Sequence, residues 1–183
     1  MQLERSLDRL TAQLKRMSLT VTTAESCTGG LVSSLLTDLP GSSSWFERGF
    51  ITYSNLAKES MLGVPPALLL SEGAVSRPVA EAMALGALMH SQADLALAVT
   101  GFAGPEGGAS EKPVGTVFFA WALRHYLTSY SLRMQFPSTS SRYDIRLLAS
   151  YYLLSGASVL LEAFETSGDW QSEEVLTSLK NLK

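Results

Sequence analysis

The chain has too few cysteines and histidines for several kinds of site. Cys27 is the single cysteine in 183 residues, which excludes an internal disulfide and a thiolate metal cage. The two histidines, His90 and His125, lie in unrelated contexts and form no ligand cluster. We therefore expect no metal and no cofactor, and neither histidine is well placed to act as the base of a serine hydrolase.

Charge is also scarce. Asp, Glu, Lys and Arg make up 17% of the chain, against about 25% in an average protein. Seventeen acidic and fourteen basic residues give a net charge of −3, which leaves no basic surface for direct binding of nucleic acid or an anionic membrane. The hydrophobic share of 46% and the mean hydropathy of +0.14 exclude a disordered chain.

Long apolar runs are missing as well. Residues 1–17 alternate charged and apolar side chains, so they do not resemble a signal peptide. The uncharged run that most resembles a membrane span is residues 147–161. It is shorter than the roughly 20 residues of a membrane-spanning helix and contains three serines. We expect it to be a buried helix of a cytoplasmic protein without membrane contact.

Periodicity and turn residues predict an α/β domain. Helical patterns cover residues 3–17, 31–39, 55–62, 76–90 and 141–165, and strand patterns cover residues 19–23, 46–53, 95–99, 115–123 and 126–136. Alternating elements followed by a predicted hairpin indicate a three-layer α/β/α sandwich with a mixed sheet. We expect one domain over residues 1–165, and a C-terminal extension over residues 166–183 that forms a short helix or a partner surface.

In such sheets ligands bind beyond the carboxyl ends of the strands. The first candidate segment there, residues 24–30, places Ser26 and Cys27 where a strand turns into a helix. A nucleophile at this position has backbone N–H groups nearby to stabilise an oxyanion. Alternatively, Ser26 or Thr28 only caps the helix, and Cys27 is a small buried hydrophobic residue rather than a rival nucleophile.

Two further segments reach the same edge. Lys58 lies one turn into a short helix, where partial burial would lower its pKa and let it serve Ser26 as a base; alternatively it is a solvated lysine. The glycine-rich residues 100–108 could cradle a phosphate or ribose, although they match no P-loop and could form an ordinary surface loop. Arg142 and Arg146 share one helix face, for phosphate binding or for structural pairing.

Taken in this order, the segments resemble the C-terminal domain family of CinA. The resemblance covers roughly residues 5–165. The matching stretches are residues 23–30, 49–58, 62–64, 73–76, 98–105, 107–108 and 112–117, with Arg142 and Arg146. It implies a five-stranded mixed sheet similar to the anticodon-binding-domain-like fold.

The resemblance also implies an activity, hydrolysis of a linear amide C–N bond. The reaction would convert nicotinamide mononucleotide to nicotinate mononucleotide and ammonia in pyridine nucleotide salvage. Ser26 would be the nucleophile, Lys58 the base, and Tyr53 a proton relay or a wall for the pyridine ring. Backbone N–H groups of residues 26–30, or those of Thr100 and Gly101, would hold the oxyanion. The expected substrate-binding residues are Glu25, Thr28, Gly29, Gly30, Asn55, Thr100, Gly101, Gly104, Lys112 and Arg142. Longer family members carry a further N-terminal domain with pyrophosphatase activity, which we do not expect here.

A second hypothesis is a catalytically silent CinA-like paralogue that binds a nucleotide or a protein partner. Phe102 is bulkier than the residue expected there from the family pattern, and its ring could crowd the pocket. In addition, the resemblance does not cover the tail after Ser167. In either case we expect a small phosphorylated nucleotide as ligand. We also expect a homo-oligomer, because the surface is apolar enough to support an interface.

Overall fold

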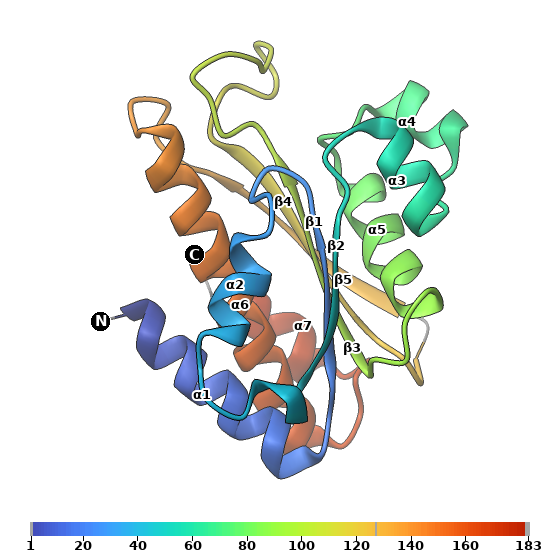
Figure 1. Ribbon diagram of the computed structural model, residues 1–183, viewed down its shortest axis with the longest axis vertical. Helices are drawn as coiled ribbons and strands as arrows, with labels where there is room; N and C mark the ends of the chain where they lie inside the picture. The colour runs from blue at the N-terminus through green and yellow to red at the C-terminus, as the bar shows by residue number, and fades with distance from the viewer. Residues whose placement is uncertain (1, 127, 182–183) are drawn as a thin grey trace.

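The computed structural model describes residues 2–126 and 128–181. Within them, five strands form one central sheet between two layers of helices (Figure 1). The strands are β1 (Val21–Glu25), β2 (Phe46–Ile51), β3 (Leu95–Gly101), β4 (Thr116–Leu123) and β5 (Thr128–Gln135). The helices are α1 (Gln2–Met17), α2 (Leu31–Thr37), α3 (Asn55–Leu62), α4 (Pro66–Glu72), α5 (Arg77–Met89), α6 (Arg142–Ser167) and α7 (Glu173–Lys180), with a 3₁₀ turn η1 over Ser42–Ser44.

The sheet is mixed, as predicted. Its strand order is β2-β1-β3-β4-β5. Strand β1 pairs in parallel with β2 and β3, whereas β3–β4 and β4–β5 are antiparallel. The carboxyl ends of β1, β2 and β3 therefore lie at one edge of the sheet, where the chain leaves each strand into a candidate segment.

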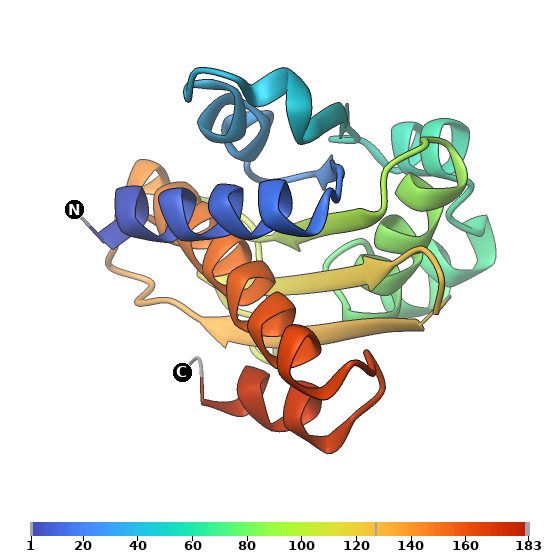
Figure 2. The same cartoon turned by 90° about the horizontal axis from the view of Figure 1, so that it is seen from below.

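One face of the sheet carries the large side chains. Leu95, Leu97 and Val99 of β3 alternate with alanines, and Phe119 and Trp121 of β4 point to the same side. Helices α1, α2, α6 and α7 cover this face, as Figure 2 shows most clearly for α1 and α6. The Trp121 indole N–H donates to the Leu153 carbonyl of α6 at 2.9 Å, so its polar atom is satisfied inside the core.

The opposite face is built mainly from alanine. Ala96 and Ala98 of β3, with Ala120 and Ala122 of β4, pack against α5. Their small side chains leave room for α5 to lie close to the sheet, and α3 and α4 pack on α5 from outside. Gly86 of α5 extends this close packing, because a Cβ there would collide with the Leu62 carbonyl.

The structure corrects several predicted boundaries. Helix α4 was missed because two consecutive prolines suggested an interruption, yet Pro66 occupies the first helical position, where no amide hydrogen is needed. Strand β1 begins at Val21 and not at residue 19, since the amide and hydroxyl of Thr20 donate to the Asp94 carboxylate at 2.8 and 2.9 Å. Leu127 of the predicted hairpin and Leu182 of the predicted tail lie outside the described residues.

Helix α6 is the one described helix long and apolar enough, by length and composition, to cross a membrane. Most of its apolar stretch is buried against the sheet and α1, so it packs as the predicted buried core helix. The segment after α6 also joins this core. Trp170 is fully buried, its carbonyl accepts the Tyr130 hydroxyl, and Val175 and Leu179 of α7 pack against the same cluster.

Candidate active site

A cavity of about 220 Å³ lies at the carboxyl ends of β1, β2 and β3. We call it the Ser26–Lys58 cavity. Four segments that are far apart in the sequence supply its walls, and the first turn of α6 closes its rim. The lining residues are Ser26, Cys27, Tyr53, Lys58, Ala74, Val75, Thr100, Gly101, Phe102, Ala103, Gly104, Glu106 and Arg142.

Ser26 is held at the end of β1 by backbone pairing on both sides. Its N–H donates to the Val99 carbonyl of β3 at 3.0 Å. On the other side, the Thr52 N–H donates to the Glu25 carbonyl at 2.8 Å. The Ser26 side chain is only 8% exposed, so its hydroxyl is presented to the cavity from a rigid turn.

Lys58 reaches Ser26 from α3. The Ser54 hydroxyl accepts the Ala57 amide at 3.0 Å and so fixes the start of this helix. Lys58, one turn further on, points inward, and its Nζ lies 3.0 Å from Ser26 Oγ and 2.8 Å from the Thr52 carbonyl oxygen. No ion pair in the described part of the chain involves Lys58. The Ser26 hydroxyl is therefore in direct contact with a buried amine that has no carboxylate partner.

Burial changes the chemistry of this amine. Lys58 is only 1% exposed, and the loss of hydration lowers its pKa from 10.5 to about 8. A substantial fraction of Lys58 is then neutral near pH 8, where Nζ can accept the Ser26 proton. The pair has both the contact and the proton affinity that an activated serine requires.

Cys27 has the opposite properties. Burial raises the pKa of its thiol to about 12, so the reactive thiolate is essentially absent at neutral pH. Cys27 lines the cavity beside Ser26 as a protonated thiol.

Glu25 points away from the cavity. Its carboxylate accepts hydrogen bonds from the amides of Gly30, Val32 and Ser33 at 2.8–3.1 Å, and from the Ser33 hydroxyl at 2.7 Å. The amides of Gly30, Val32 and Ser33 are thus already occupied by a residue of the chain itself. Gly29 and Gly30 adopt positive φ angles in this turn and do not line the cavity.

A different backbone group is available to an oxyanion. Along β3, the Val99 carbonyl faces β1, whereas the Phe102 N–H donates to β4 at the Thr116 carbonyl. Because backbone groups alternate sides along a strand, the Gly101 N–H faces the β1 side, beyond the point where β1 ends. Gly101 lines the cavity, and a Cβ there would come within 2.7 Å of Val117. This N–H is a candidate oxyanion donor.

Arg142 links two walls of the cavity at its rim. One guanidinium nitrogen donates to the Gly104 carbonyl at 2.6 Å, and another donates to the Tyr53 hydroxyl at 2.9 Å. Tyr53 is 61% exposed, so its ring forms part of the rim. Arg146, one turn along α6, instead donates to the Thr28 carbonyl at 2.6 Å and does not line the cavity.

The structure thus brings together seven of the predicted site residues. Those in the cavity are Ser26, Tyr53, Lys58, Thr100, Gly101, Gly104 and Arg142, and those outside it are Glu25, Thr28, Gly29, Gly30, Asn55 and Lys112. Asn55 is exposed at the start of α3, and the Lys112 ammonium donates to the Glu72 carbonyl at 3.1 Å.

Sequence reasoning missed part of the lining. Ala74 and Val75 reach the cavity because the Thr100 hydroxyl donates to the Ala74 carbonyl at 2.8 Å and so anchors that segment to the end of β3. Nothing in their residue types marks them as site residues. Glu106 belongs to the glycine-rich loop and could have been found as the acidic residue among its glycines.

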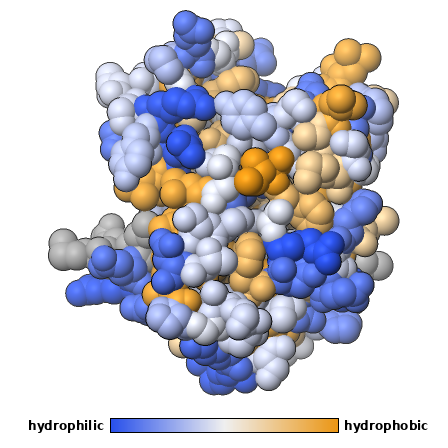
Figure 3. All heavy atoms as spheres, in the orientation of Figure 1, coloured by the Kyte–Doolittle hydropathy of each residue, from blue (hydrophilic) through white to orange (hydrophobic). Residues whose placement is uncertain are grey.

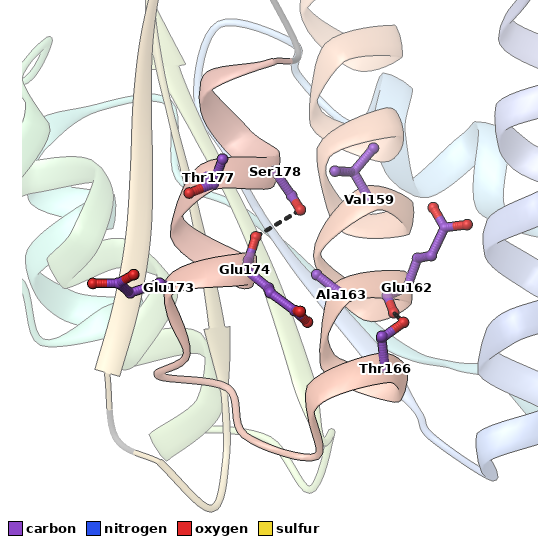
Figure 4. A pocket seen from close by; sticks show the side chains of 8 residues that line it. All are labelled: Val159, Glu162, Ala163, Thr166, Glu173, Glu174, Thr177 and Ser178. Atoms are coloured by element: carbon purple, nitrogen blue, oxygen red, sulfur yellow. Dashed lines mark hydrogen bonds between the residues drawn. The ribbon is translucent and has the colours of Figure 1, made fainter.

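A larger hollow of about 590 Å³ lies between α6 and α7 (Figure 4). It is lined by Glu162, Glu173 and Glu174 together with small residues. The hydroxyls of Thr166 and Ser178 donate to carbonyls of their own helices, so they are not activated. The surface in Figure 3 shows hydrophobic residues in several small groups separated by hydrophilic ones. The Ser26–Lys58 cavity is therefore the candidate active site.

The protein is a three-layer α/β protein with a buried Ser–Lys pair at the carboxyl ends of its parallel strands. The family model of the CinA C-terminal domain matches residues 3–156, and the chain belongs to this family.

Named relatives agree with this assignment. Nicotinamide-nucleotide amidohydrolase PncC of Escherichia coli strain K12 is 60% identical over 109 residues, which cover 60% of this chain and 66% of that protein. PncC of Enterobacter agglomerans is 49% identical over 148 residues, which cover 80% of this chain and 87% of the relative.

Solved structures share the fold. A competence/damage inducible protein named CihA, from Agrobacterium tumefaciens, superposes with a TM-score of 0.81 at 44% identity, covering 84% of this chain and 92% of that one. Competence damage-inducible protein A of Klebsiella pneumoniae gives a TM-score of 0.82 at 32% identity, covering 92% and 99%.

Proposed function

We propose that the protein hydrolyses the carboxamide of nicotinamide mononucleotide, giving nicotinate mononucleotide and ammonia. One observation carries the proposal: Ser26 Oγ lies 3.0 Å from the buried Nζ of Lys58, an amine with a lowered pKa. The names of the PncC relatives supply the substrate.

The proposed reaction begins with attack of Ser26 Oγ on the carboxamide carbon while its proton moves to the neutral Lys58 Nζ. The new oxyanion accepts a hydrogen bond from the Gly101 N–H. When the C–N bond breaks, Lys58 returns the proton to the leaving nitrogen, which departs as ammonia. Water then attacks the ester on Ser26, with Lys58 again as base, and releases the carboxylate product and free Ser26.

The substrate phosphate requires a cation that is not needed for the proton transfer. Arg142 supplies one at the rim of the cavity, where its guanidinium donates to the hydroxyl of the exposed Tyr53. We propose that Arg142 holds the phosphate and that Tyr53 forms a wall beside the pyridine ring.

The direct test is to incubate the purified chain with nicotinamide mononucleotide and to measure ammonia and nicotinate mononucleotide. We expect both products in equal amounts, and none from glutamine. If nicotinamide mononucleotide raises the melting temperature but yields no ammonia, the protein is the binding-only paralogue and the proposed reaction is wrong.

A further inference from the structure

The charges around the Ser26–Lys58 cavity match a ligand that carries both signs. Its lining includes two basic side chains, Lys58 and Arg142, and one acidic side chain, Glu106. The proton transfer uses Lys58, and Arg142 is the candidate for the phosphate. Glu106 has no role in the reaction proposed above.

The Glu106 carboxylate is free to meet a ligand. It makes no hydrogen bond or ion pair with any residue that the structure describes, and it lies on an exposed part of the glycine-rich loop. Other charged residues near this loop are engaged: the Lys112 ammonium donates to the Glu72 carbonyl, and the Arg133 guanidinium donates to the Glu111 carbonyl.

Phe102 places an aromatic ring beside the same loop. Its N–H donates to the Thr116 carbonyl at 2.9 Å, and its carbonyl accepts the Gly115 N–H at 2.7 Å, so its backbone is fixed on both sides. The ring packs next to Gly107, where a Cβ would lie 3.3 Å from Phe102 Cδ1. An acidic side chain and an aromatic ring therefore border the cavity together.

We propose that Glu106, with the ring of Phe102, recognises the positive charge of an N1-substituted pyridinium ring, so that the protein selects pyridinium carboxamides over neutral nicotinamide. The inference rests on the proposed function and adds its specificity determinant. Attachment of the ribose makes the pyridine ring of nicotinamide mononucleotide cationic, whereas free nicotinamide is neutral. A carboxylate attracts that cation, and an aromatic face adds a cation–π contact.

Binding to the Ser26→Ala variant tests the inference without turnover. The two probes are 1-methylnicotinamide, which carries the ring charge but neither ribose nor phosphate, and nicotinamide, which carries none of these. We expect tighter binding of the cation by calorimetry. We also expect Glu106→Gln in the same background to weaken cation binding about tenfold and to leave nicotinamide unchanged. High salt should reduce the preference, since Glu106 is exposed.

Glu111→Gln is the matched control, because it removes the same charge from the same loop outside the cavity. In the Ser26→Ala background, this variant should bind 1-methylnicotinamide as tightly as Ser26→Ala alone. The inference would be overturned if both substitutions weakened this binding equally, or if Ser26→Ala itself did not prefer 1-methylnicotinamide over nicotinamide.

Turnover separates the inference from the proposed function. With Ser26 present, Glu106→Gln should raise KM for nicotinamide mononucleotide about tenfold with little change in kcat, because the ring is cationic before and during the reaction. If Glu106→Gln still releases ammonia and its KM is unchanged, the role of Glu106 is refuted and the proposed function stands. Absence of ammonia from the unsubstituted protein would refute the proposed function itself.

Discussion

Glu25 and Ser26 are adjacent and both buried, yet they lie on opposite sides of the turn between β1 and α2. Glu25 faces the helix, where four donors surround its carboxylate. Ser26 faces the cavity, where it touches Lys58, which forms no ion pair with any described residue. Within one turn, a fully hydrogen-bonded carboxylate anchors the backbone, and the hydroxyl next to it remains available for the proposed reaction.

Replacement of Ser26 by Ala should give the largest effect on activity. Loss of the nucleophile should lower the rate of ammonia release from nicotinamide mononucleotide by at least about a thousandfold. The free energy of unfolding should fall by less than about 1 kcal/mol, because only one hydrogen bond of the Lys58 amine is removed. A coupled ammonia assay and urea unfolding measure the two effects.

Cys27→Ala is the control for this prediction. It should retain most of the activity, because burial keeps the Cys27 thiol protonated. An active Ser26→Ala variant together with an inactive Cys27→Ala variant would transfer the role of nucleophile to Cys27.

The pH dependence of activity should follow Lys58. Its pKa of about 8 predicts that kcat/KM rises about tenfold per pH unit below pH 8 and levels off above it, because the neutral amine is the active base. Initial rates between pH 6 and 9.5 test this. A profile that stays flat through pH 8 would exclude Lys58 as the base.

Replacement of Glu25 by Ala tests whether the Glu25 carboxylate stabilises the turn between β1 and α2. The amides of Gly30, Val32 and Ser33 would lose their acceptor, which should lower the free energy of unfolding by about 3 kcal/mol. Glu25→Gln, which keeps one acceptor oxygen, should lose less. If urea unfolding gives Glu25→Ala the stability of the parent, the carboxylate does not anchor the turn.

Replacement of Lys58 by Met should also change the pH dependence of stability. The folded pKa of about 8 is below the ordinary 10.5, so between these values the unfolded chain binds more protons than the folded one. The stability of the parent should therefore rise relative to Lys58→Met across this window, and the difference should be constant below it. Cys27 is present in both proteins, so its own titration cancels.

Urea unfolding of both proteins at pH 7, 9 and 10 measures this difference. A gap in unfolding free energy that does not change with pH would show that the environment of Lys58 does not disfavour its charged form.

Much of the fold followed from residue pattern. Leu95, Leu97 and Val99 alternate with small residues, which predicted a buried strand, and helical spacing predicted α1 and α6. Helix α4 was missed because Pro65 and Pro66 can end one element or begin the next. Local sequence does not distinguish these cases, since the packing of α4 on α5 decides between them.

For the site, residue types and the resemblance named Ser26 and Lys58, and the structure brings them into contact. The directions in which the neighbouring side chains point were harder to predict from the sequence. Glu25 was expected at the substrate but binds the start of α2, and Arg142 and Arg146 share a helix face but reach different partners. Such choices depend on which acceptors other segments bring within reach.

The sequence by itself determined the order of the strands and of the helices other than α4, the absence of an internal disulfide, and the residues able to form a Ser–Lys pair. Those properties depend on composition and on local periodicity. Only the tertiary structure decided that Lys58 is dehydrated, that the start of α2 is occupied, and that Glu106 and Phe102 border the cavity. Each of these depends on contacts between segments distant in the chain, and the low dielectric of the interior gives those contacts their chemical effect.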